Sequence, residues 1–124
     1  MSTARRQQAI AHDLVLVARH EEALSALASA LANVAGVRAE TIAADLSPAE
    51  GCRRVASRLD VGGPADVEKA DLAPVDLLVN NAGFGLGKDF LDNTLEAELA
   101  GVDVMVRAVM ILAHHAGISM RSRG

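Results

Sequence analysis

The stretch Leu14–Ala18, which reads Leu-Val-Leu-Val-Ala, decides the fold class. All of its side chains are apolar, and it lacks the polar alternation of a strand that has one face in water. It therefore predicts a strand of a parallel sheet, covered on both faces and ending at Arg19.

After this run the hydrophobic spacing changes to that of a helix, which is predicted to begin at Glu21 and to stop at Gly36. The apolar positions that share one face of this helix are Leu24, Leu27, Leu31 and Val34. A second strand is predicted over residues 37–44, closing at Asp45.

The next helix has a clear start signal, with Ser47 as N-cap, Pro48 at the first helical position and Glu50 completing a capping box. Its buried stripe is predicted to be Cys52, Val55, Ala56 and Leu59. The segment from Asp60 to Pro74 is predicted to be a surface connection, followed by a third strand over Val75–Val79.

A long helix is predicted beyond a glycine-rich loop, with Asn93 as N-cap and Glu96 in the capping-box position. Its 4-3-4-3 spacing predicts one packing face, made of Leu95, Leu99, Val102, Val106, Val109 and Ala113. Residues 117–124 have no pattern and are predicted to be frayed. Strands that alternate with helices at short joints indicate an α/β layered domain, in which ligands bind at the carboxyl ends of the strands.

The composition excludes several classes of protein. Hydrophobic residues make up 51% and charged residues 23%, as in soluble globular domains. The chain has no Tyr and no Trp, so it has no tyrosine general acid and no wide stacking platform for single-stranded nucleic acid. Its net charge of −4 has the wrong sign for a nucleic-acid partner.

The single cysteine, Cys52, excludes an intrachain disulfide and a multi-cysteine metal site. No secretory signal and no membrane span are expected, so we predict a cytoplasmic protein without a membrane partner.

Three segments, Leu14–Arg19, Ala43–Leu46 and Asp76–Gly83, resemble the second, third and fourth strands of short-chain dehydrogenases/reductases. The Asn-Asn-Ala-Gly element at the end of the third segment is the most distinctive, and the resemblance extends from about Asp13 to Ala116. It implies a single, partial Rossmann-like domain over residues 1–124, with a three-layer parallel sheet. It also implies an oxidoreductase that uses NADP.

The resemblance assigns cofactor-binding roles. Arg19 matches the basic residue that pairs with the 2′-phosphate of NADP, to which a guanidinium offers a planar fork. Asp45 and Leu46 match the pair that flanks the adenine, Asp45 by hydrogen bonding. The loop beside the cofactor is matched by Asn80, Asn81, Ala82 and Gly83. From the residues alone, Arg19 could be a solvated strand-end side chain and Asp45 a turn residue before Ser47.

The sequence departs from the family pattern in ways that affect catalysis. Residues 1–12 contain no glycine, so the first strand and the glycine-rich pyrophosphate loop are expected to be absent. The family's catalytic Ser and Tyr-x-x-x-Lys have no counterpart, and Met105 stands where these enzymes carry a catalytic Asn. We therefore expect a chain that is truncated at both ends relative to the family and is catalytically incompetent by itself.

Loss of the first strand has a structural consequence, because sheets of this type order their strands 3-2-1-4. A gap is then expected between the strands that end at Arg19 and Asn80. The two strands could pair directly, another chain could supply the missing strand, or the fold could be marginal.

Two other functions remain open. The helix that matches Leu95–Ala116 packs against its twin in family dimers, which implies a homo-oligomeric interaction module. Alternatively, Arg19 and Asp45 could mark a remnant that binds only the adenosine end of NADP.

The remaining motifs have simpler interpretations. The glycines at 83, 85 and 87 miss the dinucleotide-binding spacing by one position and are not expected to cradle phosphate. Cys52 is expected to be a small core residue rather than a reactive thiol. His114 and His115 are adjacent in sequence, so they cannot share one helix face as metal ligands would. They are expected instead to interact favourably with the dipole at a helix end.

Overall fold

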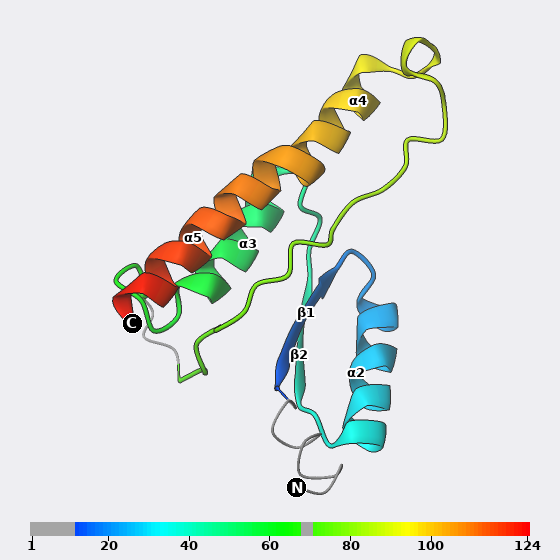
Figure 1. Ribbon diagram of the computed structural model, residues 1–124. Helices are drawn as coiled ribbons and strands as arrows, with labels where there is room; N and C mark the ends of the chain where they lie inside the picture. Colours follow the sequence, from blue (N-terminus) through cyan, green and yellow to red (C-terminus); the bar gives the residue numbers. More distant parts are fainter. Residues whose placement is uncertain (1–11, 68–70) are drawn as a thin grey trace, which may run out of the picture. The chain divides into compact units, whose positions relative to one another are not determined.

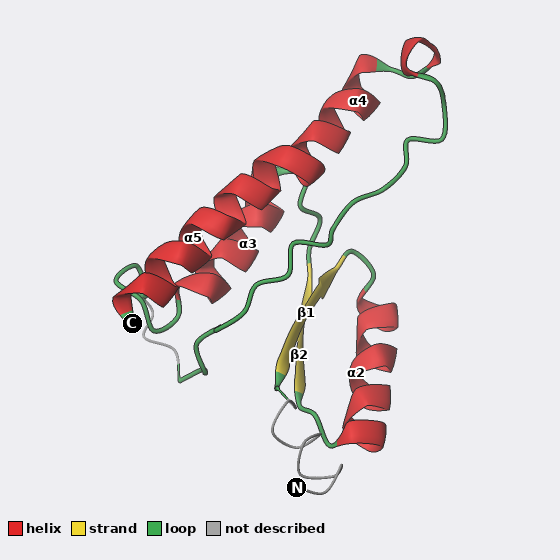
Figure 2. Ribbon diagram, in the orientation of Figure 1, coloured by secondary structure: helices red, strands yellow, loops and turns green. Residues whose placement is uncertain are grey.

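The computed structural model describes residues 12–67 and 71–124, which belong to two compact units, one ending at Ala44 and the other beginning at Asp45 (Figures 1 and 2). The α/β class and the partial Rossmann-like character expected from the sequence are confirmed. The assignment of residues 1–124 to a single domain stays a prediction.

The first unit is a β-α-β element whose two strands are parallel. Strand β1 (Leu14–Ala18) is followed by helix α2 (Glu21–Ala35) and strand β2 (Ala39–Ala43). The strands pair in parallel, with Leu14 opposite Ala39 and Ala18 opposite Ala43. Helix α2 stops where predicted, because Gly36 adopts the left-handed conformation (φ 63°) and donates its N–H to the Ala32 carbonyl.

The packing face of α2 is narrower than the sequence predicts. Leu24 is buried and Leu31 is half-buried, but Leu27 and Val34 are 48% and 87% exposed. A two-stranded ribbon covers only a narrow arc of a helix, and positions 27 and 34 lie at the edge of that arc. The strands are likewise not covered on both faces as predicted, since Val15–Val17 are only half-buried.

An ion pair connects the two strand entrances of this unit. The Arg38 guanidinium donates to Asp13 Oδ2 at 3.0 Å, and the Arg38 N–H donates to Asp13 Oδ1 at 3.2 Å. These hydrogen bonds lower the pKa of Asp13 below its ordinary value of 3.8. Because folding lowers the pKa of Asp13, the ionised carboxylate stabilises the folded state at pH values above the pKa of the unfolded chain. This stabilisation is lost as the pH falls through the pKa of the folded chain. The effect is small here, because both side chains are exposed.

The second unit is helical. It contains α3 (Ala49–Asp60), a short 3-10 turn η1 (Phe90–Asp92), α4 (Leu95–Val102), a π-helical segment η2 (Asp103–Ala108) and α5 (Val109–Ser122). Because α4, η2 and α5 follow one another without a break, they form one long helix that runs side by side with α3 over its second half (Figure 1).

The tail expected to be frayed from Gly117 is instead helical as far as Ser122, so that prediction is wrong. The reason is tertiary packing at Ser119, which is 2% exposed and donates its hydroxyl to the Val61 carbonyl at 3.4 Å. An added Cβ on Gly63 would lie 2.9 Å from Ser119 Cα, so the loop after α3 lies directly against this turn of α5.

The core of the second unit confirms one predicted stripe and corrects the other. On α3, Cys52, Val55, Ala56 and Leu59 are buried as predicted. On the long helix the buried positions are instead Gly101, Val104, Ala108, Leu112, Ala116 and Ser119. The small buried residues Ala108 and Ala116 allow the long helix to approach α3 closely, whereas a prediction from hydropathy favours the larger side chains of the other face. Leu95, Leu99, Val102 and Val106, which were predicted to pack, are 50–67% exposed.

Both predicted helix caps are displaced by one residue. The N-cap of α3 is Pro48, and it is Asp45 Oδ1 that accepts the Ser47 N–H at 2.9 Å, so Ser47 does not form a capping box. The N-cap of α4 is Thr94, whose hydroxyl accepts the Ala97 N–H at 3.2 Å. Asn93 caps Thr94 itself, since its side chain accepts the Thr94 N–H at 3.1 Å. Neighbouring polar residues compete for the same N–H groups, and periodicity cannot decide between them.

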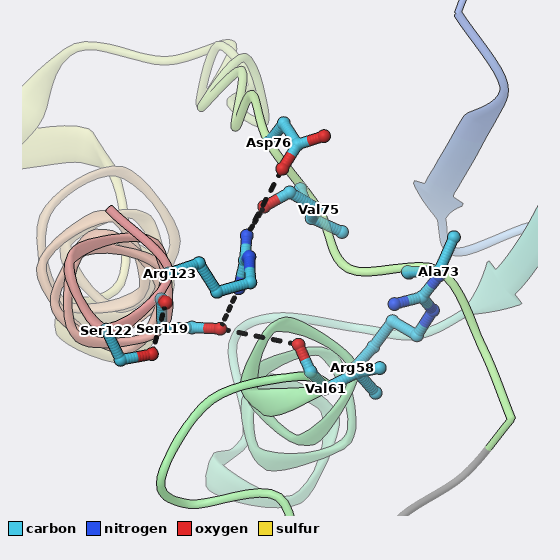
Figure 3. Close-up of polar contacts among 8 residues, drawn as sticks. All are labelled: Arg58, Val61, Ala73, Val75, Asp76, Ser119, Ser122 and Arg123. Carbon is cyan, nitrogen blue, oxygen red and sulfur yellow. Dashed lines mark hydrogen bonds and ion pairs between the residues drawn. The ribbon is translucent and has the colours of Figure 1, made fainter.

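The third predicted strand, Val75–Val79, does not form in the described part of the chain, where the sheet has only the strands β1 and β2. Two arginines bind carbonyls at the start of this segment and just before it, and Figure 3 shows the residues involved. Arg58 donates to the Ala73 carbonyl at 2.9 Å, and Arg123 donates to the Val75 carbonyl at 2.7 Å and to Asp76 Oδ1 at 3.4 Å. An apolar run predicts a strand only if a neighbouring strand is available to pair with it, and the direct pairing of the two strands left open by the sequence is not found here.

Candidate cofactor site

The first predicted cofactor residue lies where the sequence placed it. Arg19 directly follows β1, at the carboxyl end of the strand, and is exposed. The ladder extends up to this point, because the Ala44 N–H donates to the Ala18 carbonyl at 2.9 Å. A parallel strand pair therefore fixes the backbone immediately before Arg19.

Asp45 and Leu46 form the turn that leads into α3. Asp45 is exposed and Leu46 half-buried, and the Asp45 carboxylate binds the Ser47 N–H through Oδ1. Helix α3 approaches the same turn closely, because an added Cβ on Gly51 would overlap the Asp45 carbonyl. The turn role of Asp45 that the residues alone allow is thus present in the structure, and it uses one of the two carboxylate oxygens.

The Asn80–Gly83 loop is exposed along its whole length and lies in an irregular segment. Its last residue faces Met105, since an added Cβ on Gly83 would lie 3.6 Å from Met105 Cγ and 3.7 Å from its sulfur. The Met105 methyl group also lies 3.2 Å from an added Cβ on Gly101. Met105 therefore fills the space between the loop and the preceding helical turn.

Met105 belongs to the π-helical segment η2, where the backbone contains an extra residue per turn. Such segments are rare and occur often at functional sites. The sequence indicated that Met105 replaces a catalytic Asn, but neither the π-helical turn nor the contact with Gly83 has a signal in the sequence. The structure thus brings two of the predicted features, the loop and position 105, into direct contact.

The seven predicted residues are divided between the two units. Arg19 belongs to the first, whereas Asp45, Leu46 and the loop from Asn80 to Gly83 belong to the second. That all seven form one cofactor site stays a prediction.

The histidine expected at a helix end has a different role. His115 Nδ1 lies 2.7 Å from Asp60 Oδ1, which connects α5 to the last residue of α3. Because α5 continues to Ser122, His115 is not in its last turn, and the predicted contact with the helix dipole is wrong for this residue. The pair could not be predicted from sequence, since its members are 55 positions apart.

Cys52 is a buried thiol, as predicted, with 2% of its surface exposed. Burial raises the pKa of the thiol above 9.0, although the nearby charge of Arg107 opposes this shift. We expect iodoacetamide at mildly alkaline pH to alkylate Cys52 at least an order of magnitude more slowly in the folded chain than in urea, because only the exposed thiolate reacts. Mass spectrometry at timed quench points measures both rates, and equal rates would contradict the buried placement.

Neither a metal centre nor a membrane-spanning helix is found in the described ranges 12–67 and 71–124. No group of three or more His, Cys, Asp or Glu side chains there is arranged to hold a metal ion. None of the helices in these ranges is long and apolar enough to cross a membrane.

Comparison with known proteins identifies one family. The sequence model of the family described as short chain dehydrogenase matches residues 2–124, whereas no curated protein matches. A short-chain dehydrogenase from Sphingobium yanoikuyae in complex with NADPH is 31% identical, with a TM-score of 0.73 over 90% of this chain and 40% of that chain.

Two further solved structures are similar. The L-sorbose reductase from Gluconobacter frateurii, complexed with NADPH and L-sorbose, is 30% identical, with a TM-score of 0.72 over 90% of this chain and 39% of that chain. The bulky-bulky ketone specific alcohol dehydrogenase from Comamonas testosteroni is 28% identical, with a TM-score of 0.73 over 90% of this chain and 41% of that chain. The chain thus spans about two fifths of the length of these proteins. From the strand ends, the Asn80–Gly83 loop and these similarities together, the chain belongs to the short-chain dehydrogenase family.

Proposed function

We propose that this chain binds NADP(H) in the manner of a short-chain dehydrogenase but does not by itself catalyse hydride transfer. The observation that carries the first part is the exposed Arg19 at the carboxyl end of β1. Two similar structures that contain NADPH support the choice of cofactor.

The residues present suit the adenosine end of the cofactor. Arg19 would hold the 2′-phosphate through its guanidinium, which favours NADP over NAD. Asp45 would accept a hydrogen bond from the adenine through Oδ2, because Oδ1 is already bound to the Ser47 N–H. The loop from Asn80 to Gly83 would lie beside the cofactor, whose nicotinamide ring supplies the hydride when it is bound.

The absence of catalysis rests on the composition of the chain and on Met105. The sequence contains no Tyr to act as proton donor to a carbonyl oxygen. The Met105 thioether, which lies against Gly83, offers no strong acceptor to hold a water molecule at the position of the family's Asn.

Replacing Arg19 by alanine is expected to remove the preference for NADPH over NADH. A charge-assisted bond to a phosphate contributes about 1.5–3 kcal/mol, so NADPH affinity should fall by about ten- to a hundredfold while NADH affinity stays unchanged. Isothermal titration calorimetry with NADPH, NADH and 2′,5′-ADP measures the three affinities.

The matched control for this experiment is Arg121→Ala, which removes an exposed arginine near the end of α5 and should leave all three affinities unchanged. Retention of the NADPH preference in Arg19→Ala would remove the main support for the proposed cofactor.

A second candidate function is a homodimerisation module, and the exposed apolar face of α4 and η2 favours it. Leu95, Leu99, Val102 and Val106 recur at helical spacing and are at least half exposed. Contiguous apolar patches of this kind mark protein interaction sites. Analytical ultracentrifugation should then show a dimer that Leu99→Glu dissociates, and a strictly monomeric folded chain would exclude this function.

A further inference from the structure

A groove of about 300 Å³ runs between α3 and the long helix, within the second unit. Its volume lies at the lower end of the range of about 300–1,000 Å³ that is typical of small-molecule sites. It is lined by one face of α3, which includes Cys52, Arg53 and Ser57, and by one face of the long helix, which includes Arg107, Ile111 and His115. None of these residues belongs to the predicted cofactor site.

Two positive charges lie at one end of this groove. Arg53 projects from the first half of α3, and Arg107 projects from η2 close enough to Cys52 for its charge to affect the thiol. Both are exposed, and neither forms a hydrogen bond or an ion pair with another residue of the described ranges. By contrast, Arg38 and Arg123 both bind acceptors of the protein itself. Two unpaired guanidinium groups at one site suit an anionic ligand.

The remainder of the groove is apolar along its floor and polar at its far end. Cys52 and Ala56 are buried and Ile111 is half-buried, so they form an apolar floor. Asp60 and His115, which lie within hydrogen-bond distance of each other, close the other end. Asp60 lies seven positions after Arg53 on α3, which corresponds to roughly 10 Å along the helix.

We propose that this groove binds a small amphiphilic anion, in which a phosphate or carboxylate head pairs with Arg53 and Arg107 and a short alkyl chain lies on the apolar floor. The charge of the head complements the two guanidinium groups, and Ser57 provides a hydroxyl beside the same path. The pair of Asp60 and His115 limits the length of the chain. This site is independent of the proposed NADP site, because it uses none of its residues.

The test uses octyl phosphate below its micelle-forming concentration, with inorganic phosphate and octanol as the two halves of the ligand. We expect saturable binding of octyl phosphate by calorimetry, and binding at least tenfold weaker for each half. In amide NMR spectra, octyl phosphate should shift the signals of Ser57 and Ile111. Equal affinity for octanol would overturn the proposal, since the arginines would then contribute nothing.

Variants separate this site from the cofactor site. Arg53→Gln and Arg107→Gln should each weaken octyl phosphate binding by about tenfold or more without changing NADPH binding, whereas Arg19→Ala should do the reverse. Arg121→Gln, on α5 but outside the groove, is the matched control. Unchanged octyl phosphate affinity in both groove variants would overturn the proposal. A change of mass in solution in these variants would also overturn it, because a second copy of the chain would then occupy the groove.

Discussion

Replacing Gly51 by alanine is expected to destabilise the second unit by at least about 3 kcal/mol, beyond the usual cost of an overpacked core. An added Cβ at this position would overlap the Asp45 carbonyl oxygen and lie 2.7 Å from the carbonyl carbon. Neither the turn at Asp45 nor the helical turn at Gly51 can move easily. The carboxylate of Asp45 holds the turn through the Ser47 N–H, and the same helical turn carries the buried Cys52. Urea unfolding followed by far-ultraviolet circular dichroism measures the loss.

The matched control for this variant is Gly117→Ala in the interior of α5. Nothing lies within 4 Å of a Cβ added at Gly117, so alanine there should stabilise the helix by up to about 1 kcal/mol. The two substitutions are chemically identical, and only the space around them differs. Similar unfolding midpoints for both variants would contradict the close approach of α3 to Asp45.

Replacing Leu112 by alanine is expected to lower the free energy of unfolding by about 2–5 kcal/mol, because it empties a buried position between α5 and α3. Leu112 is 4% exposed and lies on the stripe that the sequence did not predict. Met110, two positions away, is 70% exposed, so Met110→Ala should change the stability by less than about 0.5 kcal/mol. Equal effects of the two substitutions on the urea midpoint would show that the helix is rotated relative to the structure.

The parts of the fold that the sequence predicts correctly are those decided by local patterns. The apolar run at Leu14–Ala18 and the helix stop at Gly36 depend on hydropathy and on backbone preference, and both appear in the structure. The α3 stripe is also correct, because that helix has one apolar face and a polar remainder.

The errors arise where a distant partner decides the outcome. The long helix is apolar on two faces, and α3 selects the one with small residues, such as Ala108 and Ala116, rather than the one with Leu99. The strand predicted over Val75–Val79 requires a neighbouring strand, which the described residues do not provide. Arg123 binds the Val75 carbonyl instead, Arg58 binds the carbonyl of Ala73 just before the segment, and no pattern in the sequence indicates these contacts.

The candidate sites divide in the same way. The strand-end position of Arg19 follows from the sequence, because a strand boundary fixes it. The contact of Met105 with Gly83 depends on a π-helical turn, and the presence of both Arg53 and Arg107 at one groove depends on how two helices pack. Tertiary packing sets both, so neither has a local signal.

The most direct test of the central claim is a titration of the purified, folded chain with NADPH, followed in the same sample by absorbance after addition of a panel of ketones and aldehydes. We expect saturable binding of NADPH, stronger than that of NADH, and no consumption of NADPH with any carbonyl compound. Oxidation of NADPH at a rate proportional to the concentration of the chain would contradict the absence of catalysis, and a folded chain that binds no NADPH would contradict the proposed cofactor.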